Sequence, residues 1–394
     1  MALKDLRSEL KKHIRDYGMF IALAVIFIVF TITTDGIFIS SRNISNLLNQ
    51  TGYIAVIAIG MTLIIVIRHI DLSVGFLSGF LGAVAAIAMT YWGLPVFIVI
   101  PMVLILGLLA GLLTAYPVAK LGIPAFVASL AGWLIYRGAL LLVTLKTGTI
   151  IIKNDIFNAI GNGYLPDLFS SEKFLPGTHK LTLVLGLIAI VLSIYNSIDA
   201  RRNKQSYGFE VLPKDLFVMK SIFVSILLAV VTWIIAGFNG MSWTLAIVLV
   251  VVLLYNFVTK RTVIGRHIYA VGGNPEAAEL SGINVKKITF IVFGSMGMLA
   301  GLSGILYASR LQSATTTAGT LLELDAIAAA YIGGVSAAGG VGSVVGSLIG
   351  AIVYTSLTSG MNLMGIDISS QYIVRGAVLA GAVIFDVATR KLGK

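Results

Sequence analysis

The stretch from residue 72 to residue 119 decides the fold, because LSVGFLSGFLGAVAAIAMTYWGLPVFIVIPMVLILGLLAGLLTAYPVA contains no Asp, Glu, Lys or Arg. A membrane-spanning helix needs about 20 apolar residues, so this stretch is long enough for two of them. Lipid offers no hydrogen-bond partners to the backbone, and strands of a membrane barrel would alternate polar and apolar residues. The stretch therefore predicts helices.

The composition extends this prediction to the whole chain. Of its 394 residues, 58% are hydrophobic and only 11% are charged, whereas soluble domains carry about 25% charged residues. We expect an all-α, polytopic transmembrane bundle of about ten spans. The predicted spans lie near residues 17–34, 51–67, 72–90, 94–116, 124–145, 181–197, 216–237, 243–258, 289–308 and 372–388.

The segment 323–360 is apolar but rich in glycine and alanine, and it fits none of these spans. With the N-terminus placed inside, Lys and Arg are roughly threefold more frequent on the inner segments, as the positive-inside rule requires. This count holds only if 323–360 returns to the side that it left. We therefore expect a re-entrant pair or hairpin of short helices there, and both termini in the cytoplasm.

The chain is expected to form one permease domain over residues 17–394, preceded by a basic, amphipathic cytoplasmic N-terminus over residues 1–16. The first hydrophobic run lacks a small-residue cleavage site, so we interpret it as a retained anchor. Two polar segments interrupt the domain. Residues 146–180 form an outer loop, and residues 259–288 form an inner one.

The composition also argues against several classes of function. The net charge is +11, but the basic residues lie in short loops, which indicates membrane topology rather than nucleic-acid binding. The chain has no cysteine and only four histidines, none with metal-ligand spacing. No nucleophile motif of a hydrolase occurs, so we predict no catalytic residue and no metal site.

The glycine-rich run GGVSAAGGVGSVVGSLIG, residues 333–350, suggests a nucleotide-binding loop at first sight. Such a loop would follow a strand and end in Gly-Lys-Ser or Gly-Lys-Thr, and neither feature is present. Gly342, Gly346 and Gly350 are four residues apart, so they predict one helix face that packs closely on a neighbour. We expect no ATP site in this chain.

Ionisable residues within or beside the predicted spans mark a second set of candidates. Charges at membrane depth are costly and usually face a cavity or a partner. Asp71, Arg137 and Asp325 are candidates for the translocation path, although Asp71 and Asp325 could instead cap helices. For Arg137 we hypothesise an ion pair with Asp325 or Glu323.

A weak internal repeat involves the same positions. Ile70-Asp71 opens one glycine-bearing run and Leu324-Asp325 opens another. Transporters are often built from repeats whose broken helices meet near the membrane midplane.

The inner segment GRHIYAVGGNPEAAELSGINV, residues 265–285, predicts a short capped helix. Asn274 can cap it and Pro275 can occupy its first position. Glu276 and Glu279 then fall in the first turn, and Gly282 ends the helix. The simpler interpretation is a connector between spans, but a short rigid helix also suits a groove on a partner protein.

Three long motifs resemble the ribose, xylose and branched-chain amino-acid permease family of ABC importers. They are GMTLIIVIRHIDLSVG (60–75), VIGRHIYAVGGNPEAAELSGINV (263–285) and ELDAIAAAYIGGVSAAGGVGSVVG (323–346). Within that family, TTDGIFISSRNISNLLNQTG (33–52) and YGFEV (207–211) are similar to the D-xylose and multiple-monosaccharide permeases. The resemblance extends from about residue 20 to the C-terminus.

The resemblance implies a ten-span subunit that pairs as a homodimer in the bacterial cytoplasmic membrane. A separate ATPase would bind ATP and magnesium, and an extracytoplasmic binding protein would deliver the sugar. The coupling motif of ABC permeases matches Asn274, Pro275, Glu276, Ala277, Ala278, Glu279 and Gly282, although the Leu-Pro that usually follows is missing. D-Xylose or several monosaccharides are the expected cargo. The alternatives are ribose or another sugar, and an ion-coupled secondary transporter.

Overall fold

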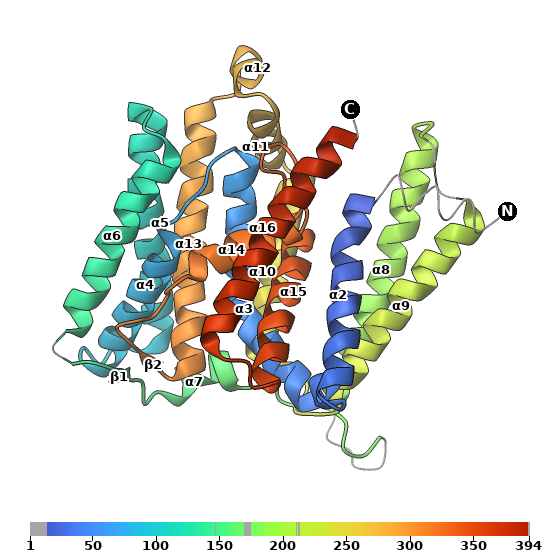
Figure 1. The fold of residues 1–394 in the computed structure, drawn as a ribbon, viewed down its shortest axis with the longest axis horizontal. Helices are drawn as coiled ribbons and strands as arrows, with labels where there is room; N and C mark the ends of the chain where they lie inside the picture. The colour runs from blue at the N-terminus through green and yellow to red at the C-terminus, as the bar shows by residue number, and fades with distance from the viewer. Residues whose placement is uncertain (1–13, 146, 169–174, 210, 212, 393–394) are drawn as a thin grey trace. The chain divides into compact units, whose positions relative to one another are not determined.

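The computed structural model describes residues 14–145, 147–168, 175–209, 211 and 213–392 (Figure 1). Most of the predicted N-terminal segment (1–16) and parts of the predicted outer loop (146 and 169–174) lie outside the described residues. The chain divides into two compact units. The larger comprises residues 1–38, 47–163 and 244–394, and the smaller comprises residues 39–46 and 164–243.

The larger unit holds most of the helices. In chain order they are α2 (Ile14–Thr33), α3 (Ser41–Val66), α4 (Val74–Thr90), α5 (Val96–Leu121), α6 (Ala125–Thr144), α7 (Asp155–Asn162), α10 (Trp243–Arg261), α11 (Val263–Gly273), α12 (Pro275–Leu280), α13 (Val285–Leu311), α14 (Leu322–Ile332), α15 (Val344–Leu363) and α16 (Ile368–Leu392). Two of these helices, α3 and α10, begin in the smaller unit. A 3₁₀ turn (Ile37–Ile39) precedes α3, and two-residue strands β1 (Ile150–Ile151) and β2 (Ser313–Ala314) pair antiparallel.

The smaller unit is built on a pair of helices, α8 (Lys180–Ser206) and α9 (Lys214–Ala236). The His179 side chain caps α8 by accepting a hydrogen bond from the Thr182 backbone N–H at 3.3 Å. A Cβ at Gly186 would overlap the Thr232 side chain. The two helices therefore approach closely at a glycine, as small residues allow in membrane proteins.

The all-α polytopic prediction is confirmed. Within the described residues, nine helices are long and apolar enough to cross a membrane, namely α3, α5, α6, α8, α9, α10, α13, α15 and α16. Eight of them match predicted spans. Two further predicted spans, 17–34 and 72–90, correspond to shorter apolar helices over residues 18–33 and 74–90.

The glycine-rich segment 323–360 differs from the expected pair of short helices. Its first helix, α14, has 11 residues and is too short to span a bilayer. Its second helix, α15, has 20 residues and is one of the nine candidate spans. The short element is thus a single broken helix, and it is followed by a full-length one.

The helix α4 is the counterpart of α14 in the first half of the chain. A Cβ at Gly304 would overlap the Ser78 carbonyl oxygen, which places α4 beside the C-terminal half of α13. A Cβ at Gly350 would overlap the Ala329 carbonyl oxygen, which places α14 beside the N-terminal half of α15. Both short helices therefore begin well inside the bundle rather than at its ends (Figure 1).

The two broken helices belong to two runs of four helices with opposite directions. In Figure 1, α3, α4, α5 and α6 trace up, down, up and down, whereas α13, α14, α15 and α16 trace down, up, down and up. In each run the second helix is the shortest, with 17 residues in α4 and 11 in α14. This is the order expected of an inverted repeat, and it agrees with the repeat suggested by Ile70-Asp71 and Leu324-Asp325.

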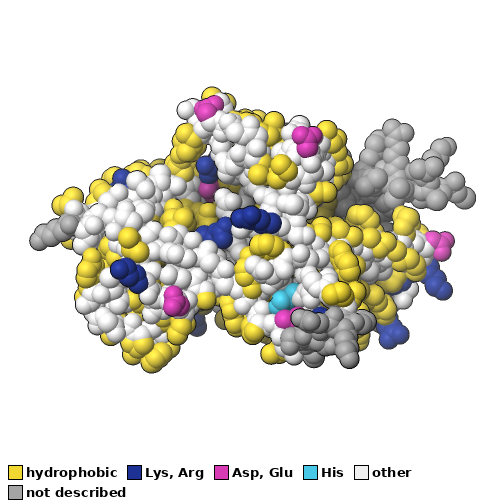
Figure 2. Space-filling view, turned by 90° about the horizontal axis from the view of Figure 1, so that it is seen from below, with side chains coloured by type: hydrophobic (Ala, Val, Ile, Leu, Met, Phe, Trp, Pro, Cys, Tyr) yellow, Lys and Arg dark blue, Asp and Glu magenta, His cyan; other side chains and the backbone are white. Residues whose placement is uncertain are grey.

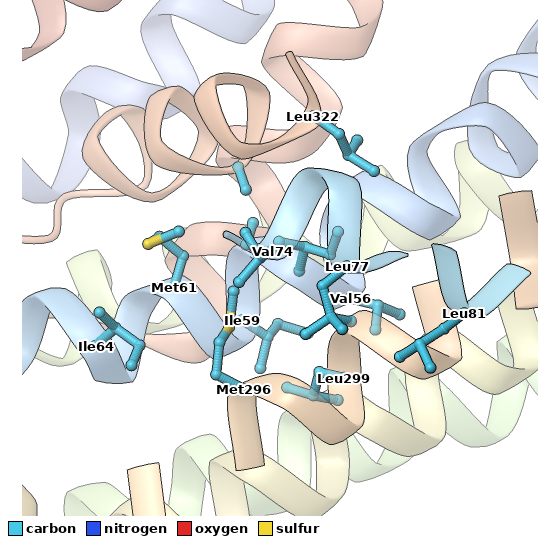
Figure 3. Packing of buried hydrophobic residues seen from close by; sticks show 14 of the residues in the cluster. Val56, Ile59, Met61, Ile64, Val74, Leu77, Leu81, Met296, Leu299 and Leu322 are labelled. Atoms are coloured by element: carbon cyan, nitrogen blue, oxygen red, sulfur yellow. The ribbon is translucent and has the colours of Figure 1, made fainter. Parts of the chain in front are cut away.

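The hydrophobic core of the larger unit forms around the two broken helices. Figure 3 shows how Val56 and Ile59 of α3, Val74 and Leu77 of α4, and Met296 of α13 come together. Each of these side chains is at most 1% exposed. The core thus fixes where α4 begins, and with it the residues immediately before α4.

Glycines bring the helix backbones into contact around this core. A Cβ at Gly297 of α13 would overlap the Gly107 carbonyl oxygen of α5, and a Cβ at Gly107 would overlap the Gly297 carbonyl oxygen. Gly346 and Gly350 of α15 pack in the same way on α14. Gly342 was predicted on the same helix face but lies before α15, where it packs against Val66 and Val335 side chains instead.

We predict that Gly297→Ala destabilises the protein, because the new methyl group has no room beside the Gly107 carbonyl. Overpacking of this kind costs about 1–3 kcal/mol, which thermal unfolding in detergent would register as a lower midpoint. Gly138→Ala is the matched control, since a Cβ at Gly138 of α6 meets no atom within 4 Å. An equal loss of stability in both variants would contradict the close α5–α13 contact.

Candidate functional site

The short helix predicted in the inner segment is present as α12, six residues long. The Asn274 side chain caps it by accepting a hydrogen bond from the Ala277 N–H at 3.1 Å, and Pro275 occupies the first position. At its other end, the Ile283 N–H donates to the Ala278 carbonyl at 3.0 Å, and Gly282 has a left-handed φ of +84°. The Asn274 cap and the turn at Gly282 are therefore formed as the sequence predicts, one at each end of α12.

Most of α12 projects away from the larger unit at one end of the fold (Figure 1). Leu280 is 90% exposed, whereas Ala278 is 4% exposed and anchors the helix. Glu276 and Glu279 are both exposed. The helix thus presents an apolar side chain beside two carboxylates, on a rigid support.

A cavity of about 540 Å³ lies at this end of the larger unit, beside α12. Its charged and titratable lining comes from Arg68, His69, Glu279 and Lys286, and the remainder is mainly apolar side chains from the α5–α6 connection. The cavity separates the exposed part of α12 from the end of α5. This part of the fold is therefore not closely packed.

Hydrogen bonds join the segment just before α12 to the end of α3, and the end of α3 to the loop between α14 and α15. The Arg68 side chain, which follows α3, donates hydrogen bonds to the carbonyl oxygens of Gly272 (2.7 Å) and Gly273, just before α12. The Gly340 N–H, which lies between α14 and α15, donates to the Val66 carbonyl at 2.9 Å. We call these five residues the glycine junction. It joins the segments that lead into α4, α12 and α15.

Two of the three glycines of this junction, Gly272 and Gly340, are required by its geometry. A Cβ at Gly272 would overlap the Val66 carbonyl oxygen. Gly340 has a left-handed φ of +72°, a conformation that side chains other than glycine rarely adopt. Arg68 itself has a φ of +65°, so its backbone turns sharply where α3 ends.

Just before α4, Asp71 stabilises the turn that leads into the helix. Its Oδ1 accepts hydrogen bonds from the Ser73 N–H at 2.9 Å and the Ser73 hydroxyl at 2.6 Å. Asp71 is 2% exposed. Asp71 thus fixes the turn that leads into α4, whereas Ser73 occupies the capping position and makes no side-chain capping bond.

In the first turn of α14, Glu323 and Asp325 are both buried. The Trp133 Nε1–H of α6 donates to Glu323 Oε1 at 2.9 Å. A Cβ at Gly75 of α4 would overlap the other oxygen of Glu323. The starts of the two broken helices are thus in direct contact, and the absence of a side chain at Gly75 makes room for the carboxylate.

Asp325 is paired with Arg375 of α16 rather than with Arg137. The Tyr354 hydroxyl of α15 donates to Asp325 Oδ1 at 2.6 Å, and Arg375 Nε donates to the Tyr354 oxygen at 2.7 Å. Asp325 therefore joins α14, α15 and α16. This arrangement shows a bonded network, and does not resemble a helix cap.

The hypothesis that Arg137 pairs with Asp325 or Glu323 is wrong for the described contacts. Its guanidinium donates to the Thr316 carbonyl at 2.6 Å and lies 4.9 Å from the centre of the Phe76 ring. The carbonyl belongs to the loop between α13 and α14. Arg137 thus holds the loop before the broken helix, and the carboxylates within it are bound by Trp133 and Arg375.

Arg375 is held in position from the start of its own helix. Asp367 lies just before this helix and accepts a hydrogen bond from the Ser370 hydroxyl at 2.7 Å. This bond, together with bonds from backbone N–H groups, lowers the pKa of Asp367. Gln371 then links α16 to α15 by donating to Asn362 Oδ1 at 2.8 Å. Arg375 follows one turn later. The sequence pattern indicated no partner for Arg375, and it gave no sign of a role for Tyr354 or Trp133.

The described part of the chain contains no group of three or more His, Cys, Asp or Glu side chains that could hold a metal ion. Arg68, Asp71, Arg137, Asp325 and Arg375 are instead engaged in the structural contacts above. The chemistry of this interior is therefore that of hydrogen bonding and ion pairing.

Comparison with known proteins identifies the family to which the chain belongs. A family model described as "Branched-chain amino acid transport system / permease component" matches residues 43–383. The chain belongs to this permease family. It is a transport subunit, not an enzyme, and a multi-pass membrane protein.

Relatives of this permease match over nearly their full length. A xylose transport system permease protein, XylH, of Haemophilus influenzae is 40% identical over 96% of this chain and 98% of its own. XylH of Escherichia coli is 38% identical over 96% of this chain and 93% of its own. A ribose import permease protein, RbsC, of Haemophilus influenzae is 36% identical over 98% and 97%. No solved structure matches the chain.

We predict that exchanging the two charges of the Asp325–Arg375 pair restores stability lost in the single variants. Asp325→Arg or Arg375→Asp alone places two like charges side by side in the interior, which costs at least the roughly 3–5 kcal/mol of breaking a buried ion pair. Thermal unfolding in detergent should show partial recovery in the double variant. The control combines Asp325→Arg with Arg137→Asp, which should not recover. Rescue by the Arg137 exchange would contradict the observed pairing.

Proposed function

We propose that this permease is the membrane-spanning subunit of an ATP-binding-cassette importer for an aldose, D-xylose or several monosaccharides. The observation that carries the proposal is the full-length similarity to two xylose permeases at 40% and 38% identity. The ribose permease at 36% makes ribose the second candidate. The sugar crosses unchanged, so the subunit needs a path and not a reactive group.

We further propose that α12 is the helix on which the ATPase docks. Its support is the exposed Leu280 beside Glu276, on a helix capped at both ends. The ATPase is cytoplasmic, so this end of the larger unit faces the cytoplasm. The beginning of α2 and the end of α16 lie at the same end as α12 (Figure 1). Both termini are then cytoplasmic, in the cytoplasmic membrane.

The opposite end would face the extracytoplasmic binding protein that delivers the sugar. It contains α7 and the β1–β2 pair, and its surface shows charged side chains between hydrophobic ones (Figure 2). Two copies of the permease would form a homodimer around the path. ATP and magnesium would bind to the ATPase subunits, since the glycine-rich segment of this chain lacks the Lys of a nucleotide loop.

The glycine junction gives the movement of α12 a direct route to the interior. Arg68 binds the carbonyls before α12 and is followed by the segment that carries Asp71 to the start of α4. Gly340 binds Val66 and is preceded by α14. Closure of the ATPases would displace both broken helices together, and so exchange the outward and inward states. ATP supplies the bias because it binds these states differently.

An ion-coupled secondary transporter is the alternative class. Such a carrier does not need an exposed, capped helix at its inner end. Of the described carboxylates at depth, Asp71 and Asp325 are bound by protein donors, and Glu323 is bound by Trp133 at one of its two oxygens. The exposed capped helix and the protein-bound Asp71 and Asp325 favour the ATP-driven importer.

We predict ATP-dependent uptake of D-xylose in cells that lack their own xylose importer and express this permease with its ATPase and binding protein. Labelled D-xylose uptake should continue in the presence of a protonophore and stop when the ATPase is omitted. Competition with ribose, arabinose, galactose and glucose then ranks the cargo. Uptake that needs the proton gradient and no ATPase would overturn the proposal.

We predict that Glu276→Lys weakens binding of the ATPase, because it reverses an exposed charge in the first turn of α12. Co-purification of the ATPase with the permease from membranes should fall, while the amount of folded permease stays unchanged. Asp155→Lys is the matched control, since Asp155 follows an Asn154 cap in the same way but at the opposite end of the unit. Equal retention of the ATPase by both variants would count against docking at α12.

A further inference from the structure

A small cavity lies between the broken helix α14 and the last helix α16. Its volume is about 150 Å³, and it is lined by Asp325, Tyr354, Tyr372, Arg375 and Gly376, with leucine side chains at its edge. This is the space of several water molecules. The cavity therefore has room for part of one small polar molecule, but not for an oligosaccharide.

The cavity opens on the outside of the larger unit. Tyr372 is 47% exposed and Leu324 is 38% exposed. The side chains of Arg375 and Asp325 remain 18% and 12% exposed, although Tyr354 places them beside the middle of α15. Charged groups that face hydrocarbon at this depth are costly and rare. This opening is thus expected to face water or protein rather than lipid.

The lining has the chemistry that a monosaccharide requires. A sugar offers hydroxyl groups that both donate and accept hydrogen bonds, together with an apolar face of C–H groups. Arg375 donates to Asp325 and Tyr354, which occupies two of the five N–H donors of a guanidinium. Asp325 supplies acceptor oxygens, and the Tyr372 ring lies 5.7 Å from the Arg375 guanidinium at the rim. Aromatic rings provide a flat apolar surface beside such polar groups.

We propose that this cavity, which we call the α14–α16 cavity, is a contact site for the sugar during its passage through the permease. The ring of Tyr372 packs against the C–H face of the sugar. Arg375 and Asp325 exchange hydrogen bonds with its hydroxyl groups. This inference rests on the proposed function, since it names the place at which the same cargo is held.

The small volume agrees with a site of passage. A transport path must bind its cargo strongly enough to admit it and weakly enough to release it. A cavity that encloses only part of a sugar makes few contacts, so the affinity stays low. The cavity also touches α14, which the proposed mechanism displaces together with the glycine junction. Displacement of α14 then changes the site and releases the sugar.

Gly376 provides a direct test, because a Cβ at this position meets no atom within 4 Å and would extend into open space beside the cavity. Gly376→Leu should fill the cavity without disturbing the fold. Gly381→Leu is the matched control, since Gly381 lies on the same helix, also meets no atom within 4 Å, and does not line the cavity.

The experiment uses the complete importer in proteoliposomes with labelled D-xylose. We expect Gly376→Leu to lower the initial uptake rate by about tenfold relative to Gly381→Leu, with both variants equally stable and equally able to bind the ATPase. Gly376→Ala should lower uptake of a hexose more than uptake of a pentose, because the larger sugar needs more of the cavity. Tyr372→Phe should retain uptake, and Tyr372→Ala should lose it.

Three outcomes separate the possibilities. Equal uptake by the two leucine variants overturns the inference while leaving the importer proposal intact. A smaller homodimer fraction in Gly376→Leu, measured by light scattering, would assign the cavity to contact between two copies and also overturn it. Absence of monosaccharide uptake by the unchanged permease would instead contradict the proposed function itself.

Discussion

The structure depends on two helices that begin inside the membrane. A helix start leaves backbone N–H groups without intrahelical partners, and lipid cannot supply them. Before α4 the turn is fixed locally, since Asp71 accepts hydrogen bonds from the backbone N–H and the hydroxyl of Ser73. For α14 the surroundings contribute more, because Arg137 holds the preceding loop through the Thr316 carbonyl. The charged residues in the interior thus serve the broken helices first.

The glycines follow from the same constraint. Loops that enter a bundle must lie against helices without leaving gaps, and a side chain would hold the backbones apart. Gly75 and Gly304 allow the start of α4 to contact both α13 and the start of α14. Gly272 and Gly340 allow similarly close contact near α12. Backbone contacts of this kind transmit displacement efficiently, because no flexible side chain intervenes to absorb it.

Local patterns in the sequence predicted local structure well. Apolar runs located the long helices, and Asn274, Pro275 and Gly282 predicted the limits of α12, because caps depend on neighbours in the chain. The partner of Asp325 was not predictable in this way. Arg137 and Arg375 both lie within predicted spans, and only the packing of α16 against α14 decides between them. The full-length α15 was missed because the Lys and Arg count required residues 323–360 to return to the side that they left, and a pair of short helices met that requirement as well as a broken helix followed by a full span.

The pairing of Asp325 with Arg375 also suits an uncharged cargo. A single charge in the path would attract ions and hold water tightly, at a high cost in lipid surroundings. An ion pair offers donors and acceptors in one place while the net charge stays zero. Because Tyr354 of α15 and Arg375 of α16 both bind Asp325, movement of α14 relative to these two helices changes the length of these bonds. The hydrogen-bonding capacity of the site is then linked to the conformation of the broken helix.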